Sequence, residues 1–96
     1  MNLRKLGKIE GQLKAILRSP LNRSSADMRR YAVQLERKMV NRGKEPTFER
    51  TDPPPFPPLT IPGHPGDLAP GTARSVAQQL LSDCDEWRLY LEHQER

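Results

Sequence analysis

The first stretch of the chain repeats apolar residues with the period of a helix. They recur at intervals of three and four positions, at Leu6, Ile9, Leu13, Ile16 and Leu17. Five basic residues lie off this stripe, Arg4, Lys5, Lys8, Lys14 and Arg18, so the spacing predicts a basic amphipathic helix over residues 2–18. Asn2 can cap its start. We expect the Ser19-Pro20 pair to end it, because the residue before a proline disfavours the α conformation.

A second stretch with the same period follows. Its apolar positions are Met28, Tyr31, Ala32 and Leu35. Ser24 stands three residues before Asp27 in an approximate capping box, so the predicted helix covers residues 24–38. The next residues, 39–42, can finish this helix or begin a strand, and the sequence leaves the two open.

The helical period disappears in the middle of the chain. Short β-prone runs at residues 47–50 and 59–61 predict two strands. Residues 52–58 between them contain five prolines, which cannot donate ladder hydrogen bonds, so we expect a polyproline-II connection. This connection is either a ligand for an aromatic-lined groove of the SH3, WW or EVH1 type or a rigid surface loop.

The last stretch again has a helical period. Apolar positions follow one another at Val76, Leu80, Cys84, Trp87 and Leu91. Thr72 can cap this helix, which we expect to be about 20 residues long. Trp87, Tyr90 and Leu91 either pack against the first helix or form an interface with a second copy or a partner. The single cysteine excludes an intrachain disulfide and a cysteine-based metal cluster, and we expect it to be a small buried helix residue.

The length of 96 residues fits one domain whose core comes from a few amphipathic elements. A deep-cleft enzyme with its own cofactor fold does not fit this length. No apolar run approaches the roughly 18 residues of a membrane span, and the first residues lack the apolar stretch of a signal peptide. We therefore expect a cytoplasmic protein that does not enter membranes.

Charge is divided unequally between the two halves of the chain. Residues 1–50 carry 13 basic and 5 acidic residues, whereas residues 51–96 carry 3 basic and 7 acidic ones. A basic surface concentrates polyanions, so a nucleic-acid face belongs in the first half. The alternative is that the basic half faces the acidic half, within one chain or between two.

A motif in the middle of the chain resembles the signature of the HicA family of toxins. In that family an apolar strand ends in Val/Ile-Pro-x-His, and a short loop then leads to Gly-Thr and a closing helix. Here Ile61-Pro62-Gly63-His64 precedes Gly71-Thr72, within residues 59–76.

The resemblance continues upstream and covers residues 20–81. Residues 20–28 resemble the Pro-x-Asn-x-x-Phe-x-Asp-Leu entry to the family's first domain helix, with Ser25 in place of Phe. Residues 43–48 fall where the family has Gly-Ser-His-His-x-Phe.

The resemblance implies an α+β fold like that of double-stranded-RNA-binding domains (dsRBD-like), with a small antiparallel sheet of two or three strands and helices packed on one face. Residues 1–19 then form an extra N-terminal helix, and residues 20–96 form a single HicA-like domain with an extended C-terminal helix. The implied function is that of the toxin in a type II toxin-antitoxin system. Such a toxin cuts mRNA as an endonuclease without metal or another cofactor, and a HicB-like antitoxin neutralises it.

The sequence departs from the family at the catalytic position. Glu45 replaces the catalytic His, while Lys44 and Pro46 replace the neighbouring Ser and His. Metal-free RNA cleavage needs a base for the ribose 2′-OH and an acid for the leaving oxygen, which histidine serves well near neutral pH. Glu45 is the candidate base and His64 the candidate acid. Alternatively, Glu45 is a solvated surface carboxylate and His64 is a histidine with a structural role. Because the catalytic histidine is replaced, we expect altered or lost cleavage.

RNA binding does not need the missing histidine. Basic residues that cluster in sequence around the lost motif are the candidate RNA contacts, because Lys and Arg neutralise phosphates: Arg37, Arg42, Lys44 and Arg50. Phe56 in the proline-rich stretch either stacks on a base or anchors its loop. The rival function is a non-catalytic interaction module that acts through its terminal helices. We expect no metal site, because His64 and His93 lie far apart in sequence.

Overall fold

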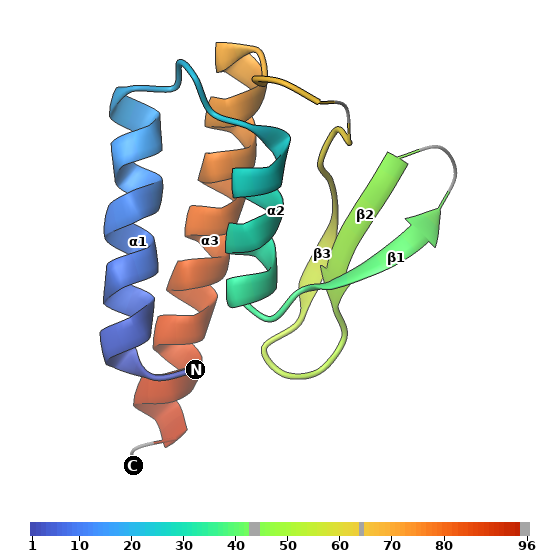
Figure 1. Cartoon of the computed structure of the whole chain (residues 1–96). Helices are drawn as coiled ribbons and strands as arrows, with labels where there is room; N and C mark the ends of the chain where they lie inside the picture. Colours follow the sequence, from blue (N-terminus) through green and yellow to red (C-terminus); the bar gives the residue numbers. More distant parts are fainter. Residues whose placement is uncertain (43–44, 64, 95–96) are drawn as a thin grey trace.

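The structure is a computed structural model that describes residues 1–42, 45–63 and 65–94, apart from the side chain of Arg42. Its elements are α1 (Leu3–Arg18), α2 (Ser25–Gln34), β1 (Lys38–Arg42), β2 (Glu45–Arg50), β3 (Phe56–Thr60) and α3 (Pro70–Gln94). The strands form an antiparallel sheet in the order β1-β2-β3 (Figure 1). The predicted α+β fold, with a small antiparallel sheet and an additional N-terminal helix, is confirmed, and of the two or three strands expected the sheet has three.

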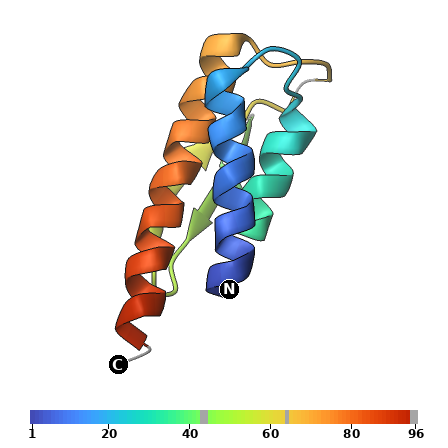
Figure 2. The same cartoon turned by 90° about the vertical axis from the view of Figure 1, so that its left-hand side faces the viewer.

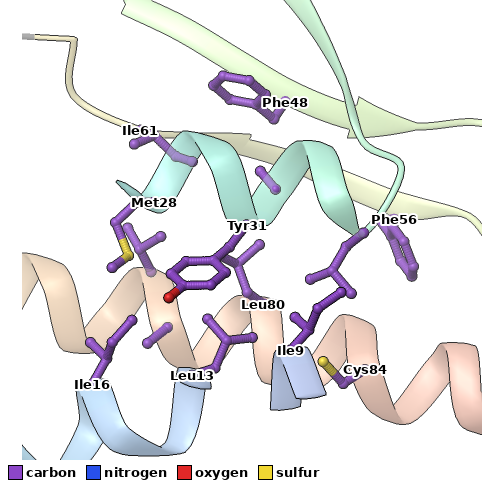
Figure 3. Packing of buried hydrophobic residues seen from close by; sticks show 14 of the residues in the cluster. Ile9, Leu13, Ile16, Met28, Tyr31, Phe48, Phe56, Ile61, Leu80 and Cys84 are labelled. Atoms are coloured by element: carbon purple, nitrogen blue, oxygen red, sulfur yellow. The ribbon is translucent and has the colours of Figure 1, made fainter. Parts of the chain in front are cut away.

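The helices all lie on one side of the sheet. In Figure 1 the sheet occupies one side of the molecule and α1 the opposite side, with α2 and α3 between them. The view in Figure 2 shows α1 in front of α2 and α3, and the sheet behind. Figure 3 shows Phe48 on the sheet side of α2, while Met28 and Tyr31 point towards α1 and α3. A single hydrophobic core therefore extends from the sheet to α1.

The first helix has the boundaries that its pattern predicts. The Asn2 side chain accepts a hydrogen bond from the Lys5 amide at 2.8 Å, and the helix ends at Arg18, one residue before Ser19. Its buried residues are Leu6, Ile9, Leu13 and Ile16. The apolar stripe faces the core, so its burial stabilises a helix that two glycines weaken.

The second helix is shorter than predicted. The Ser24 hydroxyl caps it by accepting from the Asp27 amide at 3.1 Å, but the helix ends at Gln34, four residues before the predicted end. Glu36 has a φ of 70°, in the left-handed region, which turns the chain out of the helix. The open question over residues 39–42 is resolved in favour of a strand, β1.

The proline-rich stretch is partly a strand. β3 begins at Phe56 and includes Pro57 and Pro58, so the prediction of a polyproline-II connection is wrong for the last three residues of 52–58. Prolines are tolerated here because β3 is an edge strand. Phe56 is 4% exposed and packs edge-on against Trp87, with 6.2 Å between ring centroids. It anchors this region, and its predicted alternative role of stacking on a base is wrong.

The last helix is longer than predicted at both ends. It spans 25 residues and starts at Pro70, a residue type whose fixed φ suits the first turn. Trp87 is buried, and its indole nitrogen donates to the Leu35 carbonyl at 2.9 Å. Tyr90 packs edge-on against Trp87. In the described part of the chain no helix, α3 included, combines the length and the apolar character needed to cross a membrane.

Cys84 is fully buried, as its position on the apolar face predicts. Burial, reinforced by Glu10 and neighbouring aspartates, raises the pKa of the thiol to about 12. The thiolate is the reactive form, so we expect Cys84 in the folded protein to resist a thiol reagent such as Ellman's reagent at pH 8. Unfolding in urea should restore rapid reaction. Complete labelling of the folded protein within minutes would contradict this packing.

Candidate functional site

The two segments that carry the predicted catalytic pair meet at one end of the sheet. The Ile61 amide donates to the Pro46 carbonyl at 3.2 Å. A side chain placed on Gly63 would meet the Pro46 ring at 3.3 Å. Residues 61–63 thus lie beside the residue that follows Glu45. His64 itself lies outside the described residues.

Glu45 has the surroundings of a surface carboxylate. It begins β2 with an exposed side chain, and its register partner across the ladder is Arg42. Carboxylates that act as effective bases near neutral pH sit in apolar, water-poor surroundings. The exposed position of Glu45 does not provide such surroundings. The described residues also contain no group of three or more His, Cys, Asp or Glu side chains that could hold a metal ion.

The predicted RNA contact at Arg37 is wrong, because this side chain is buried. Its guanidinium donates to both carboxylate oxygens of Asp83, at 2.6 and 2.9 Å. It also donates to the carbonyls of Phe48 and Pro57, at 2.6 and 2.5 Å. Arg37 therefore joins the start of the sheet to β2, β3 and α3, and no donor faces solvent.

Asp83 is the buried partner that the sequence interpretation missed. Desolvation raises the pKa of its carboxyl above the ordinary value, although the hydrogen-bonded Arg37 guanidinium acts against this shift. One signal was present in the sequence. Asp83 lies three residues after Leu80 and four before Trp87, on the apolar face of α3, where a carboxylate needs a buried cation.

Arg50 is also a structural residue, so its predicted contact with RNA is wrong. Its guanidinium stacks on the Trp87 ring at 4.9 Å from the centroid and donates to carbonyls of the proline-rich loop. Glu36 lies 3.5 Å away as its ion-pair partner, and the Arg50 side chain is 14% exposed. Alternation along β2 explains this orientation, because Arg50 lies two residues after the buried Phe48 and faces the helices.

Two of the four predicted RNA contacts remain untested. The backbone of Arg42 closes β1, but its side chain lies outside the described part of the chain, as does Lys44. Their contact with RNA stays a prediction.

A cleft between α1 and α2 is lined by three basic side chains. It has a volume of about 360 Å³ and is lined by Lys5, Lys8, Ile9, Gln12, Arg30 and Gln34. Lys5 and Lys8 are exposed, and no described residue forms an ion pair with either. Arg30 has one exposed partner, Asp27, at 3.3 Å. Exposed pairs of this kind are weak and exchange readily with other anions.

The helical spacing of α1 separates its charges. Lys5, Lys8 and Gln12 lie three and four residues apart and face α2. The acidic residue of α1, Glu10, lies on the other side and pairs with Arg88 of α3 at 2.9 Å. The cleft therefore keeps its positive charge, because the nearby carboxylate is directed elsewhere. The sequence shows the basic residues of the first helix, but only the folded structure shows that Lys5 and Lys8 lie near Arg30.

Comparisons of the chain with models of protein families, with curated protein sequences and with solved structures returned no match.

Proposed function

We propose that the protein binds RNA through the α1–α2 cleft, as a HicA-like chain that has lost efficient cleavage. The observation that carries this proposal is the convergence of three cationic side chains, Lys5, Lys8 and Arg30, on one cleft. Lys and Arg that neutralise phosphates release condensed counterions, and this release drives binding. Gln12 and Gln34 add amide groups that can hydrogen-bond to sugars and bases.

The HicA-like part of the proposal is supported by the order of elements after α1. A helix, three antiparallel strands and a closing helix on the same face of the sheet follow one another, which is the arrangement that the resemblance implies. The backbone hydrogen bond from the Ile61 amide to the Pro46 carbonyl also joins the two segments that the resemblance relates to catalysis. The proposal includes a role as the toxin of a type II toxin-antitoxin system in the cytoplasm, with a HicB-like antitoxin as protein partner.

The proposed binding has a direct test with the purified chain. Fluorescence anisotropy with a labelled RNA of about 20 nucleotides should give an affinity that weakens with salt, with a log–log slope of about −2 for three phosphate contacts. An affinity that does not change with salt concentration, or no binding at about 0.1 M salt, would contradict RNA binding through these side chains.

Cleavage is expected to be absent or very slow. Glu45 is exposed and lies in register with Arg42, so it lacks the surroundings of an efficient base. In the presence of EDTA, end-labelled RNA incubated with the protein should remain intact on a denaturing gel, and Glu45→Gln should bind RNA with unchanged affinity. Rapid metal-independent cutting that Glu45→Gln abolishes would show that the family's activity survives.

The rival function, interaction through the terminal helices, has less support. The apolar stripe of α1 and the apolar residues of α3 up to Trp87 are buried within the same core. Among the described residues of α3, Leu89 is the one large apolar side chain that is exposed, at 63%, while Leu81, Tyr90 and Leu91 pack partly against the core. One such residue is ordinary on a protein surface.

A further inference from the structure

A second, apolar groove lies between α2 and the first strand. It measures about 470 Å³ and is lined by Ala26, Arg29, Arg30, Val33, Gln34, Met39 and Phe48. Val33 and Met39 are each 57% exposed, so both present apolar surface to solvent. Phe48 is 2% exposed and belongs to the core beneath. The groove is thus an apolar surface that the described elements leave uncovered.

The groove runs beside a strand that can accept another strand. In the described sheet β1 pairs with β2 alone, so its other edge is free. The opposite edge is β3, where Pro57 and Pro58 lack backbone N–H groups. Of the two edges of this sheet, β1 is therefore the one that can form a regular ladder with an added chain.

The register of β1 fixes what an added strand would meet. Met39 lies opposite the buried Phe48, so it faces the helices and the groove. Lys38 lies opposite Glu49, so it faces the other side of the sheet. Successive side chains of an added strand would alternate between these two environments. Apolar residues suit the side of Met39, and acidic residues suit the side of Lys38.

The charges around the groove select an acidic occupant. Arg29 and Arg30 lie on its α2 wall. The Arg29 Nε is buried and has no hydrogen-bond partner among the described residues. A carboxylate bound at the groove would give this Nε a hydrogen-bond acceptor. A second copy of this chain fits poorly, because two β1 strands paired around Val40 would place Lys38 of each opposite the Arg42 position of the other.

From these observations we propose that the α2–β1 groove and the free edge of β1 bind an extended acidic segment of a partner protein, with apolar and acidic residues in alternation. The segment adds a strand to β1 and its apolar side chains fill the groove beside Val33 and Met39. Its alternate carboxylates lie on the other side of the strand, towards Lys38, and the arginines of α2 at the groove add a general attraction for an acidic segment. This inference does not rest on RNA binding. The groove shares Arg30 and Gln34 with the α1–α2 cleft, but Val33 and Met39 lie outside that cleft, so variants at these two positions test the inference separately.

The proposal is tested with a labelled peptide of about ten residues that alternates valine and glutamate, measured by fluorescence anisotropy. We expect saturable binding with a Kd below about 100 μM. Val33→Glu and Met39→Glu should each weaken it at least about tenfold, because each places a carboxylate inside the groove. Leu21→Glu and Leu89→Glu are matched controls, since each adds the same charge at a side chain that is 63% exposed elsewhere. They should change the Kd less than about twofold.

Two further measurements separate strand addition from simple charge attraction. A peptide with proline at its central position should bind at least about tenfold more weakly, because it cannot complete the ladder. Bound peptide should also slow hydrogen exchange at the amides on the free edge of β1. No binding, equal losses in the groove variants and controls, or equal binding of a valine–lysine peptide would overturn the proposal. It would also be overturned if Val33→Glu and Met39→Glu weakened RNA binding as strongly as peptide binding.

Discussion

Replacing Asp83 by alanine is expected to lower the free energy of unfolding by about 3–5 kcal/mol, because it leaves the buried Arg37 guanidinium without its counter-charge. Small domains are stable by only about 5–15 kcal/mol in total, so this one change should remove a large part of the stability. The loss should appear as a lower midpoint in urea with an almost unchanged slope.

Removing the charges of both Arg37 and Asp83 should lower the free energy of unfolding by less than the sum of the two single changes. Double variants that replace a buried ion pair by apolar side chains of similar size are often tolerated. In Arg37→Met with Asp83→Leu, the carbonyls of Phe48 and Pro57 would still lose their donor, so a loss of about 1–3 kcal/mol should remain. A double-mutant cycle therefore isolates the energy of the pair.

The control for the buried pair is the partly exposed pair between Arg88 and Glu10, whose side chains are 37% and 19% exposed. Arg88→Met should cost less than about 1 kcal/mol, since solvent screens this pair. An Asp83→Ala variant that loses less than about 1 kcal/mol, or one no worse than Arg88→Met, would contradict the role of Asp83 as the buried counter-charge.

Neutralising the α1–α2 cleft is expected to weaken RNA binding by about a hundredfold at 0.1 M salt. Each phosphate contact with a single strand contributes about 0.7 to the slope of log affinity against log salt. The variant with Lys5→Gln, Lys8→Gln and Arg30→Gln removes three contacts, so its slope should fall by about 2 and its affinity at 0.1 M salt by about two decades.

The matched control changes the same amount of charge on the outer face of α1. Arg4, Lys14 and Arg18 are exposed and do not line the cleft. Their replacement by glutamine should reduce affinity by less than about tenfold, through the weaker general field of the protein. Equal losses in the two triple variants would mean that RNA recognises net charge and not the cleft.

The helices could be predicted because their apolar periodicity and caps are local signals. Asn2 and Ser24 cap α1 and α2 as their residue types indicate. The end of α2 could not be predicted, since it depends on a left-handed turn at Glu36, which glycine or asparagine would have signalled. The start of β3 was hidden because prolines are compatible with an edge strand but not with a central one.

The candidate site was predicted less well, because charged side chains near one another in sequence do not share a surface. Arg37 and Arg50 were grouped with Arg42 and Lys44, yet both turn inward to partners on α3, Asp83 and Trp87. These partners lie more than thirty residues away along the chain, and sequence patterns carry little information about such pairs. The α1–α2 cleft was missed for the same reason, since Lys5 and Arg30 converge only in the folded chain.

An NMR titration of the isotope-labelled protein with a short RNA distinguishes the α1–α2 cleft from the end of the sheet as the place where RNA binds. We expect the amide signals of α1 around Lys5 and Lys8, and those of α2 around Arg30, to shift most and to saturate together. Shifts confined to the end of the sheet around Glu45, with α1 and α2 unchanged, would contradict it.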